Sequence, residues 1–302
     1  MNINFNYINI IKESASIDIN LSFKLIKHCI KLLKSKETEG EARSIIIYIL
    51  DNWHKVDSSA QQLWTDMIEA VGFYPYLEKY SSKFKLESTS SLIRKGFYKS
   101  DNLDNIYFHE EQKELLQKIL EGNNLIISAP TSFGKSLLIE EIVASKKYKN
   151  IVIIQPTLAL LDETRKKLMK YEPHYKIIIK TSQPFSCEKG NIFLLTAERI
   201  LEYYPNIPKI DFLILDEFYK LSAKRDDERS DILNNAIYLL LKKYNCSFLF
   251  LGPNIQNISS GFVEKYKAEF YKSNYSLVVN EEVDIYKYNE GKFGRSGKKK
   301  LF

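Results

Sequence analysis

The feature that most constrains the fold of this chain is the stretch Leu125-Ile-Ile-Ser-Ala-Pro-Thr-Ser-Phe-Gly-Lys-Ser136. It begins as an apolar run of the β type, turns through residues 129–134 and enters a helix at about Lys135. A strand, a tight loop and a helix that starts with Gly-Lys-Ser form an arrangement that cradles phosphate groups. Backbone N–H groups of the loop and the positive end of the helix dipole both attract an anion. The stretch therefore predicts a phosphate-binding turn.

Three residues of this turn have separate tasks. Gly134 allows the backbone to approach the phosphates closely. Lys135 supplies a positive charge for the β- and γ-phosphates, and the Ser136 hydroxyl can coordinate Mg²⁺. The usual first glycine is replaced by Ala129. An ordinary strand-to-helix turn with a surface lysine is the alternative. We expect ATP and Mg²⁺ as ligands, held by Ala129, Pro130, Thr131, Ser132, Phe133, Gly134, Lys135 and Ser136.

Composition excludes several classes of protein. The chain has 302 residues, 44% of them hydrophobic, which suffices for one large or two modest domains. Its three cysteines have no metal-ligand spacing, and their odd number argues against a disulfide framework. The N-terminus lacks the pattern of a signal peptide, and no apolar run approaches transmembrane length. We expect a cytoplasmic protein with no membrane contact. A formal net charge of +6 is compatible with nucleic-acid binding.

Residues 1–85 are predicted to form a helical accessory domain without a catalytic constellation. One helical face is expected to bury Phe23, Ile26, Ile30 and Leu33. The dense apolar run at residues 45–50 favours a buried helix, although a strand fits it equally. Ser59 and Gln62 have the spacing of a capping box for a third helix, and Gly72 is a plausible stop. Trp53 and Trp64 are expected in the core rather than at a ligand.

Residues 86–106, rich in Ser, Lys and Asn, are predicted to be a linker, and an α/β pattern follows at residues 107–285. A helix at Glu110–Glu121 comes first. The expected strands are Leu125–Ile127, Ile151–Ile154, Ile177–Ile179, Ile192–Leu195, Phe212–Leu215 and Phe248–Leu251, with weaker ones near Ala268–Tyr271 and Tyr275–Val279. The helices between them are expected at about 135–146, 158–170, 197–204 and 228–244. Apolar strands that alternate with helices indicate a buried parallel sheet sandwiched by helices. Ligands of such sheets bind beyond the carboxyl ends of the strands.

An apolar strand that starts at Phe212 ends in two carboxylates, Asp216 and Glu217. Such a pair is usually solvated when it lies on a surface. Here it ends a fully apolar strand downstream of the phosphate-binding turn. Asp216 can therefore hold Mg²⁺, directly or through water, and Glu217 can orient and deprotonate an attacking water molecule.

In their order, these motifs resemble those of the superfamily 2 helicases of the DEAD/DEAH-box type. Residues 129–136 are similar to helicase motif I, and Asp216-Glu-Phe-Tyr219 is similar to motif II. Gln155-Pro-Thr-Leu-Ala-Leu-Leu-Asp162 resembles motif Ia, and Leu195-Thr-Ala-Glu-Arg199 resembles motif Ib. Gly252-Pro-Asn254 stands where the family usually has Ser-Ala-Thr, which puts the coupling role of motif III in doubt. The resemblance implies a RecA-like domain with a P-loop, preceded by the small α-helical domain.

The resemblance also implies further contacts. Gln112, in Phe108-His-Glu-Glu-Gln112, is similar to an adenine-reading element, because its amide both donates and accepts hydrogen bonds. The alternative is a polar residue on an exposed helix. Phe97 is a weaker candidate for stacking on the base. Motifs Ia and Ib imply contacts to the backbone of single-stranded DNA or RNA, through the side chains of Pro156, Thr157, Thr196 and Arg199 and through helix N-termini.

A complete helicase of this superfamily has a second RecA-like domain, which supplies arginine fingers. Residues 286–302 instead suggest a flexible basic tail, in which Arg295 is a weak finger candidate. The chain is therefore expected to be a fragment that hydrolyses ATP slowly and does not unwind duplexes alone, the second domain lying in the same or another chain. The wording of motifs I and II looks closest to helicase subunits of Hachiman-type antiphage defence systems. Those subunits pair with a nuclease.

The sequence thus predicts the ATP-binding half of a superfamily 2 helicase or translocase, in which Mg-ATP hydrolysis is coupled to single-strand binding. Two alternatives stay open. One is an ATP-dependent switch or nuclease-associated ATPase without unwinding, whose turnover would not respond to nucleic acid. The other is a non-catalytic interaction module, which would keep the fold but would not bind nucleotide. The intact Lys135, Asp216 and Glu217 argue against the second.

Overall fold

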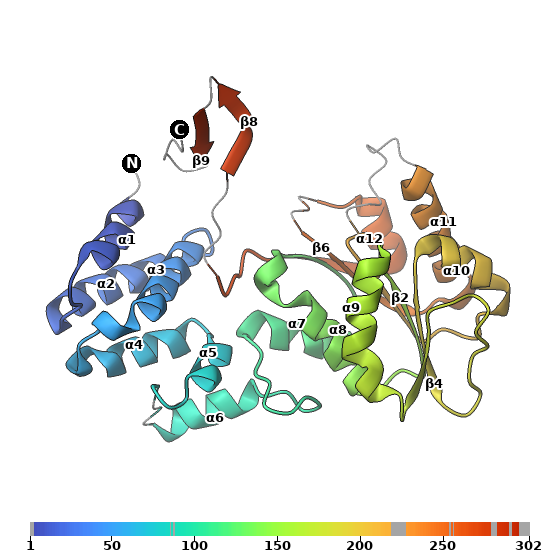
Figure 1. Cartoon of the computed structure of the whole chain (residues 1–302), viewed down its shortest axis with the longest axis horizontal. Helices are drawn as coiled ribbons and strands as arrows, with labels where there is room; N and C mark the ends of the chain where they lie inside the picture. Colours follow the sequence, from blue (N-terminus) through green and yellow to red (C-terminus); the bar gives the residue numbers. More distant parts are fainter. Residues whose placement is uncertain are drawn as a thin grey trace. The chain divides into compact units, whose positions relative to one another are not determined.

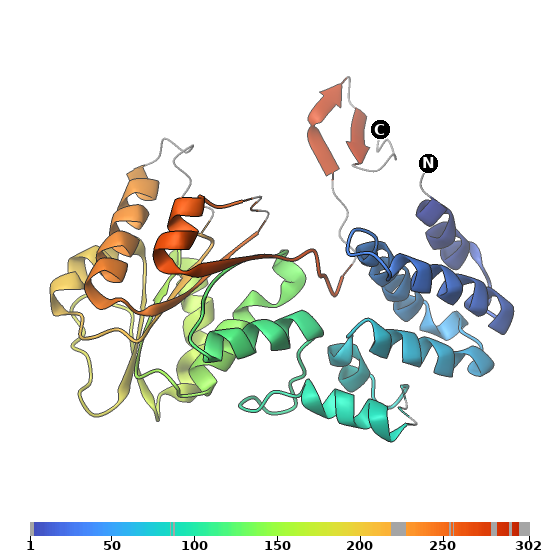
Figure 2. The ribbon, with the colours of Figure 1, turned by 180° about the vertical axis from the view of Figure 1, so that it is seen from behind.

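A computed structural model of the chain describes residues 3–84, 86, 88–218, 228–253, 255, 257–278, 283–289 and 292–295 (Figures 1 and 2). The chain divides into two compact units. One unit comprises residues 1–71 and 276–302, and the other comprises residues 72–275. The division into compact units falls after Val71, and the domain boundary expected at residue 85 stays a prediction. The chain enters the second unit, called the α/β unit below, after Val71 and leaves it after Tyr275.

The first unit is helical, as the sequence predicts. Its helices are α1 (Ile3–Glu13), α2 (Ile19–Leu32), α3 (Glu39–Asp51), the short η1 (Trp53–Lys55) and α4 (Ser58–Ala70). The apolar run at residues 45–50 is therefore helical, and the alternative of a strand is wrong. Trp64 is fully buried and donates from its indole nitrogen to Oγ of Ser22 at 3.0 Å. This bond ties α4 to α2 inside the core.

Two details of this unit differ from the sequence-based prediction. Phe23 and Ile30 are about half exposed, at 56% and 49%, whereas Leu25, Ile26 and Cys29 are buried. The apolar stripe of α2 is therefore rotated, because Ser22 and Cys29 pack inward although they are not strongly apolar. Helix α4 begins at Ser58 with Asp57 as its N-cap residue, so the expected capping box of Ser59 and Gln62 does not form.

The start of the second unit contains two helices, α5 (Tyr74–Lys79) and α6 (Thr89–Phe97). Helix α6 lies inside the range that the sequence predicts as a linker. Its N-cap is Ser88, whose hydroxyl accepts from the backbone N–H of Ser91 at 3.0 Å. After it, Lys99 and Tyr107 form an isolated antiparallel bridge. Ser and Lys are compatible with this short capped helix, and composition alone does not distinguish it from a linker.

The core of the second unit is a seven-stranded, fully parallel sheet. Its strands are β1 (Asn124–Ser128), β2 (Asn150–Ile154), β3 (Tyr175–Ile178), β4 (Gly190–Leu195), β5 (Phe212–Asp216), β6 (Ser247–Gly252) and β7 (Ala268–Lys272). In space they follow the order β3-β4-β2-β5-β6-β1-β7. The predicted parallel sheet is confirmed. The expected strand at Tyr275–Val279 is not observed over 275–278, and residue 279 lies outside the described part of the chain.

Helices cover both faces of the sheet, as Figures 1 and 2 show. One side carries α7 (Glu110–Leu120), α8 (Lys135–Ala144) and α9 (Leu158–Leu168), and the other carries α10 (Ala197–Tyr203), α11 (Glu228–Tyr244) and α12 (Ser260–Tyr266). The core of the second side joins β-strand residues such as Phe193 and Phe250 to Leu240 of α11. The sandwich of helices around the sheet is therefore confirmed.

Strands β1, β2, β4, β5 and β6 end at one edge of the sheet, since they are parallel. The strand ends carry the motif residues: the turn at 129–134 follows β1, Gln155 follows β2, Thr196 follows β4 and Asp216 ends β5. The order of the strands places β2 and β5 side by side and β6 between β5 and β1. This topology gathers sequence motifs up to about ninety residues apart at one edge.

The expected basic tail, residues 286–302, is described only in part. Strands β8 (Val283–Asn289) and β9 (Lys292–Arg295) form an antiparallel pair in the first unit. The remaining residues of the tail and the side chain of Arg295 lie outside the described part of the structure.

Candidate nucleotide-binding site

The phosphate-binding turn has the shape that its sequence predicts. After β1, residues 131–133 form a short 3-10 turn, and Gly134 has φ +82° before α8 starts at Lys135. A positive φ of this size is strained for any residue with a side chain. Ser136 lies in the first turn of α8, where the backbone N–H groups of the helix end are available to an anion. The turn therefore presents a glycine, a cation and helix N–H groups together.

Lys135 is partly buried and bonded within the turn. Its Nζ donates to the carbonyl oxygens of Ala129 at 2.8 Å and Pro130 at 2.9 Å. Burial lowers the pKa of this ammonium group, while the nearby carboxylates of Asp216 and Glu217 act in the opposite direction. Lys135 thus lies near both carboxylates, so the sheet brings the first and second predicted motifs together.

Gln112 is buried, which excludes the alternative of a polar residue on an exposed helix face. Its Nε2 donates to the carbonyl oxygen of Phe133 at 2.8 Å, and its Oε1 accepts from the backbone N–H of His109 at 3.1 Å. The carboxamide thus holds the phosphate-binding turn and completes the N-terminal capping box of α7. These are the contacts that the amide makes within the chain, and its reading of an adenine stays a prediction.

His109 is a site residue that the sequence analysis did not identify. Its ring is fully buried, its Nδ1 accepts from the backbone N–H of Gln112 at 3.3 Å, and its Nε2 lies 3.3 Å from the carbonyl oxygen of Phe133. With Nδ1 as acceptor, the proton belongs on Nε2, which then donates to that carbonyl. His109 and Gln112 therefore converge on the same atom of the turn.

The ring of His109 belongs to a group of aromatic rings that contact one another. The ring of His109 stacks on Tyr275 with centroids 4.0 Å apart and planes at 14°, and it meets the edge of Phe133 at 4.7 Å. Tyr275 in turn contacts Phe73 edge-on at 5.8 Å. The phosphate-binding turn is thus packed, through two buried rings, onto residues at both ends of the α/β unit.

Asp216 ends β5 beside Gln155, which follows β2. Oδ2 of Asp216 accepts from Nε2 of Gln155 at 3.2 Å, and Oδ1 accepts from the backbone N–H of Glu217 at 3.0 Å. Burial raises the pKa of the Asp216 carboxyl, and the bond from Gln155 opposes this shift. Glu217 has φ +57°, in the left-handed region where residues other than glycine are strained. The end of β5 is therefore a constrained pair of carboxylates.

The residues predicted to touch nucleic acid lie at neighbouring strand ends. Thr157 is exposed and caps α9, its hydroxyl accepting from the N–H of Leu160 at 3.3 Å. Thr196 is the N-cap residue of α10, and Pro156 is half-buried. Arg199 is also half-buried and donates from Nη1 to the carbonyl oxygen of Ile179 at 3.1 Å. These side chains lie on α9, α10 and their N-terminal loops.

The segment in the place of motif III is bound to the strand before the phosphate turn. Oγ of Ser128 accepts from the backbone N–H of Ile255 at 2.8 Å and donates to the carbonyl oxygen of the same residue at 3.1 Å. A Cβ at Gly252 would lie 2.9 Å from the side chain of Ile255. Asn254 and Tyr219, which complete the two predicted motifs, lie outside the described residues.

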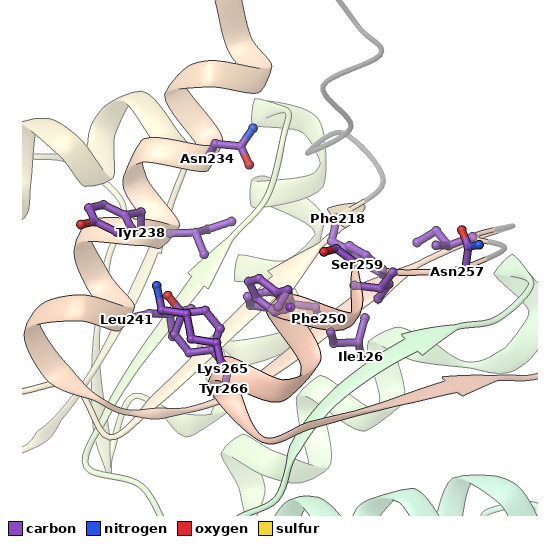
Figure 3. Close-up of a pocket in the computed structure, with 15 residues that line it drawn as sticks. Ile126, Phe218, Asn234, Tyr238, Leu241, Phe250, Asn257, Ser259, Lys265 and Tyr266 are labelled. Atoms are coloured by element: carbon purple, nitrogen blue, oxygen red, sulfur yellow. The ribbon is translucent and has the colours of Figure 1, made fainter.

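A cavity of about 920 Å³ lies on the sheet face between α11 and α12 (Figure 3). Phe218, the residue after Glu217, borders it together with Phe250 and Ile255. Among the described residues that line it, Lys265 is the one cation. Triphosphates require several donors and positive charges. The described lining of this cavity therefore differs from that of the phosphate-binding turn, and Phe218 places the cavity next to Glu217.

Phe97 lies at the end of α6 with 55% of its surface exposed. Its ring meets that of Tyr98 edge-on at 5.2 Å, and Nζ of Lys113 lies 5.8 Å from its centroid. The side chain thus has a defined environment on a helix, although the sequence predicts a linker. Gln155 lies in the motif Ia segment and His109 lies in the segment of Gln112, but the sequence assigns neither of them a role at this site. Tyr275 lies in no motif, and only the fold shows that these residues are close to the site.

Comparisons with known proteins agree with this organisation. Residues 1–90 match the family model of the Anti-bacteriophage protein B N-terminal domain, and residues 109–251 match the DEAD/DEAH box helicase family. The chain is 30% identical over 267 residues to Anti-bacteriophage protein B of Escherichia coli (strain K12), in an alignment that covers 85% of this chain and 36% of that protein. It is 26% identical over 173 residues to Helicase POLQ-like of Caenorhabditis elegans, covering 50% of this chain and 18% of that protein.

Among solved structures, a hypothetical ATP-dependent RNA helicase from Sulfolobus tokodaii matches with a TM-score of 0.42 and 17% identity, over 61% of this chain and 56% of that one. The chain spans about a third of the length of the first relative and less than a fifth of the second. In the described part of the chain, no helix combines the length and the apolar character needed to cross a membrane. The match of residues 109–251 to the DEAD/DEAH box helicase model and the similarity to Anti-bacteriophage protein B identify a superfamily 2 helicase-like RecA domain in a homologue of an anti-bacteriophage protein.

Proposed function

We propose that the α/β unit binds Mg-ATP at the edge formed by β1 and β5 and hydrolyses it in response to single-stranded nucleic acid. The observation that carries this proposal is the position of Lys135 after β1 and of Asp216 and Glu217 at the end of β5, on the same edge of the parallel sheet. Both carboxylates act on the Lys135 ammonium group. A cation, a helix N-terminus and a pair of carboxylates are the parts that phosphoryl transfer requires.

The residues present fit a nucleoside triphosphate. Gly134 leaves a cradle that a side chain would fill, since an added Cβ would lie 2.5 Å from Nε2 of Gln112. Lys135 reaches the phosphates by exchanging its bonds to the Ala129 and Pro130 carbonyls for bonds to phosphate oxygens. Because those carbonyls are polar acceptors inside the turn, this exchange keeps the ammonium group bonded in both arrangements.

The residues also fit a magnesium ion. Ser136 and Asp216 would hold it, with oxygen ligands of the type that Mg²⁺ prefers. When bound, the ion would neutralise charge on the phosphate oxygens. Glu217 would accept the proton of the attacking water at its carboxylate. Its backbone N–H donates to Oδ1 of Asp216, which orients the Asp216 carboxyl group.

The nucleic-acid surface in this proposal comprises Pro156, Thr157, Thr196 and Arg199. Arg199 would exchange or share its bond to the Ile179 carbonyl to reach a phosphate. We expect Arg199→Ala to weaken binding of a single-stranded oligonucleotide and to reduce the salt dependence of that binding, since each phosphate contact contributes roughly one unit to the slope.

The test of nucleotide binding compares Lys135→Ala with Lys209→Ala. Lys209 lies in the loop before β5, at the opposite end of the sheet, and serves as the matched control. A fluorescent ATP analogue with Mg²⁺ should bind the wild-type chain and Lys209→Ala equally, and Lys135→Ala at least about tenfold more weakly. Equal binding to all three proteins would place the nucleotide elsewhere or show that binding is non-specific.

An oligonucleotide in the same titration separates the helicase unit from the two alternatives. Nucleotide affinity or turnover that changes with the oligonucleotide supports the helicase unit. Nucleotide binding whose affinity does not change with the oligonucleotide favours an ATP-dependent switch. The absence of nucleotide binding favours an interaction module. Efficient turnover would need an arginine finger, which raises the rate of related reactions by about 10³–10⁵-fold. We propose that a second RecA-like domain, in the same or another chain, supplies it, and that a nuclease subunit is a partner in antiphage defence.

A further inference from the structure

The side-chain amide of Gln155 is buried, and one of its two polar atoms has no hydrogen-bond partner among the described residues. The residue is 2% exposed, and its backbone N–H donates to the Leu195 carbonyl at 3.3 Å, which extends the β2–β4 ladder by one residue. The backbone of Gln155 is therefore fixed by the sheet. The position of its carboxamide beside the end of β5 follows from that register rather than from a mobile loop.

The two ends of this carboxamide have different environments. Nε2 donates to Oδ2 of Asp216 at 3.2 Å, which fixes the orientation of the amide, because an ionised carboxylate only accepts. Oε1 is buried and has no hydrogen-bond partner among the residues that the structure describes. A buried carbonyl oxygen without a donor is uncommon and calls for an explanation at each place where it occurs.

An unsatisfied carbonyl oxygen next to a carboxylate makes a small cluster of acceptors. Such a cluster needs a cation or a strong hydrogen-bond donor. Because it lies beside the proposed magnesium ligand Asp216, the magnesium ion and its bound waters are the candidates. Magnesium retains several bound waters in sites of this kind, and those waters are strong donors. Groups that orient the ligands of a metal contribute substantially to its affinity.

We propose that Gln155 is a positioning residue for the metal of this site. Its Nε2 sets the orientation of the Asp216 carboxylate, and its Oε1 accepts a hydrogen bond from a water bound to the magnesium ion. This inference rests on the proposed Mg-ATP site and adds to it a residue of the motif Ia segment. That segment would then serve the metal through Gln155 and the nucleic acid through Thr157, two residues further along the same strand end.

The proposal separates metal affinity from nucleotide affinity. Gln155→Met keeps the volume and apolar contacts of the side chain but removes both polar atoms. We expect this variant to bind the ATP analogue in the presence of a chelator as the wild type does. With nucleotide saturating, we expect it to bind divalent ions about tenfold more weakly, within the roughly 10- to 100-fold range for such supporting residues. Mn²⁺ provides the readout, through the loss of its free electron paramagnetic resonance signal on binding.

Asn191→Leu is the matched control. Asn191 is 1% exposed near the start of β4, at the other end of the sheet, and its amide is fully engaged with Ser186 and Asn150. This variant should be less stable than the wild type, as measured by thermal unfolding, but should keep the wild-type affinity for Mn²⁺. The control therefore shows the effect of losing a buried amide without a metal role.

The outcomes are distinguishable. Unchanged Mn²⁺ affinity in Gln155→Met would overturn the inference and leave an ordinary water as the partner of Oε1, while the proposed function stands. Equal weakening of nucleotide binding with and without the metal would also overturn it, because Gln155 would then only support the fold. If the wild type binds no nucleotide at all, the proposed function fails and this inference fails with it.

Discussion

A β-carbon on residue 134 would lie 2.5 Å from Nε2 of Gln112, which is closer than non-bonded atoms approach. Gly134 is thus required by two independent constraints, its φ of +82° and the amide that bonds the neighbouring Phe133 carbonyl. The first constraint comes from the turn and the second from helix α7. The close approach of this glycine to Gln112 is therefore part of the packing of the unit.

Gly134→Ala should lower both stability and nucleotide affinity. The left-handed conformation alone costs a residue with a side chain about 1–3 kcal/mol, and the displaced Gln112 adds to it. Urea unfolding measures the stability, and titration with the ATP analogue measures the affinity. Gly96→Ala is the control, because a Cβ at Gly96 in α6 meets no atom within 4 Å. Equal stability of the two variants would contradict the strained turn.

The stacked rings of His109 and Tyr275 should be energetically coupled. Tyr275 is 2% exposed, so Tyr275→Ala is expected to cost about 3 kcal/mol, whereas Tyr275→Phe keeps the stacked ring. A double-mutant cycle of His109→Ala and Tyr275→Ala, followed by urea unfolding, should give a coupling of about 0.5–1.5 kcal/mol. The pair His109→Ala and Tyr171→Ala should show additive effects, and additivity in both cycles would contradict the stacking.

The three thiols should differ in reactivity. Burial raises the pKa of Cys29 and Cys246 to about 12, whereas Cys187 is exposed. Because the thiolate is the reactive form, we expect one rapid reaction per chain with a thiol reagent at pH 8 and three after denaturation. Cys187→Ser should remove the rapid phase. A rapid phase that persists in this variant would show that a buried thiol is accessible.

Stability should fall at alkaline pH through two buried tyrosines. Tyr148 donates to the Ile119 carbonyl at 3.0 Å, Tyr175 donates to the Tyr148 carbonyl at 2.8 Å, and burial raises the pKa of both to about 12. Their ordinary pKa is 10.0, so the unfolded chain loses these protons first. Their contribution is complete below pH 10 and is lost as the pH rises through 12. Urea midpoints should therefore fall less between pH 9 and 11 in Tyr175→Phe than in the wild type.

The sequence predicts the sheet and the edge at which its motif residues lie well, because both depend on local signals. Each inner strand is a continuous apolar run, and the helices between the strands have their own periodicity, so the apolar pattern alone places β1 and β5 along the chain. Residues such as Lys135 and Asp216 then follow at strand ends, and parallel strands bring those ends together. The parallel pairing of the strands places motifs that are distant in the sequence at one edge of the sheet.

Other features depend on partners that are distant in the chain and give no local signal. His109 caps helix α7, and its ring also contacts the Phe133 carbonyl of the phosphate-binding turn and stacks on Tyr275, a residue more than 160 positions away in the chain. The same holds for Gln155, whose proximity to Asp216 arises from the pairing of β2 with β5. The rotated face of α2, with Phe23 exposed, reflects packing that apolar periodicity alone does not determine.

The aromatic contact between Phe73 and Tyr275 has a consequence for the architecture. These residues stand next to the two boundaries of the α/β unit, so the ends of residues 72–275 lie beside each other. A unit whose ends meet can be inserted into a single loop of a host protein without stretching either junction. Residues 72–275 thus have the geometry of an inserted domain, whose first and last residues are neighbours in space.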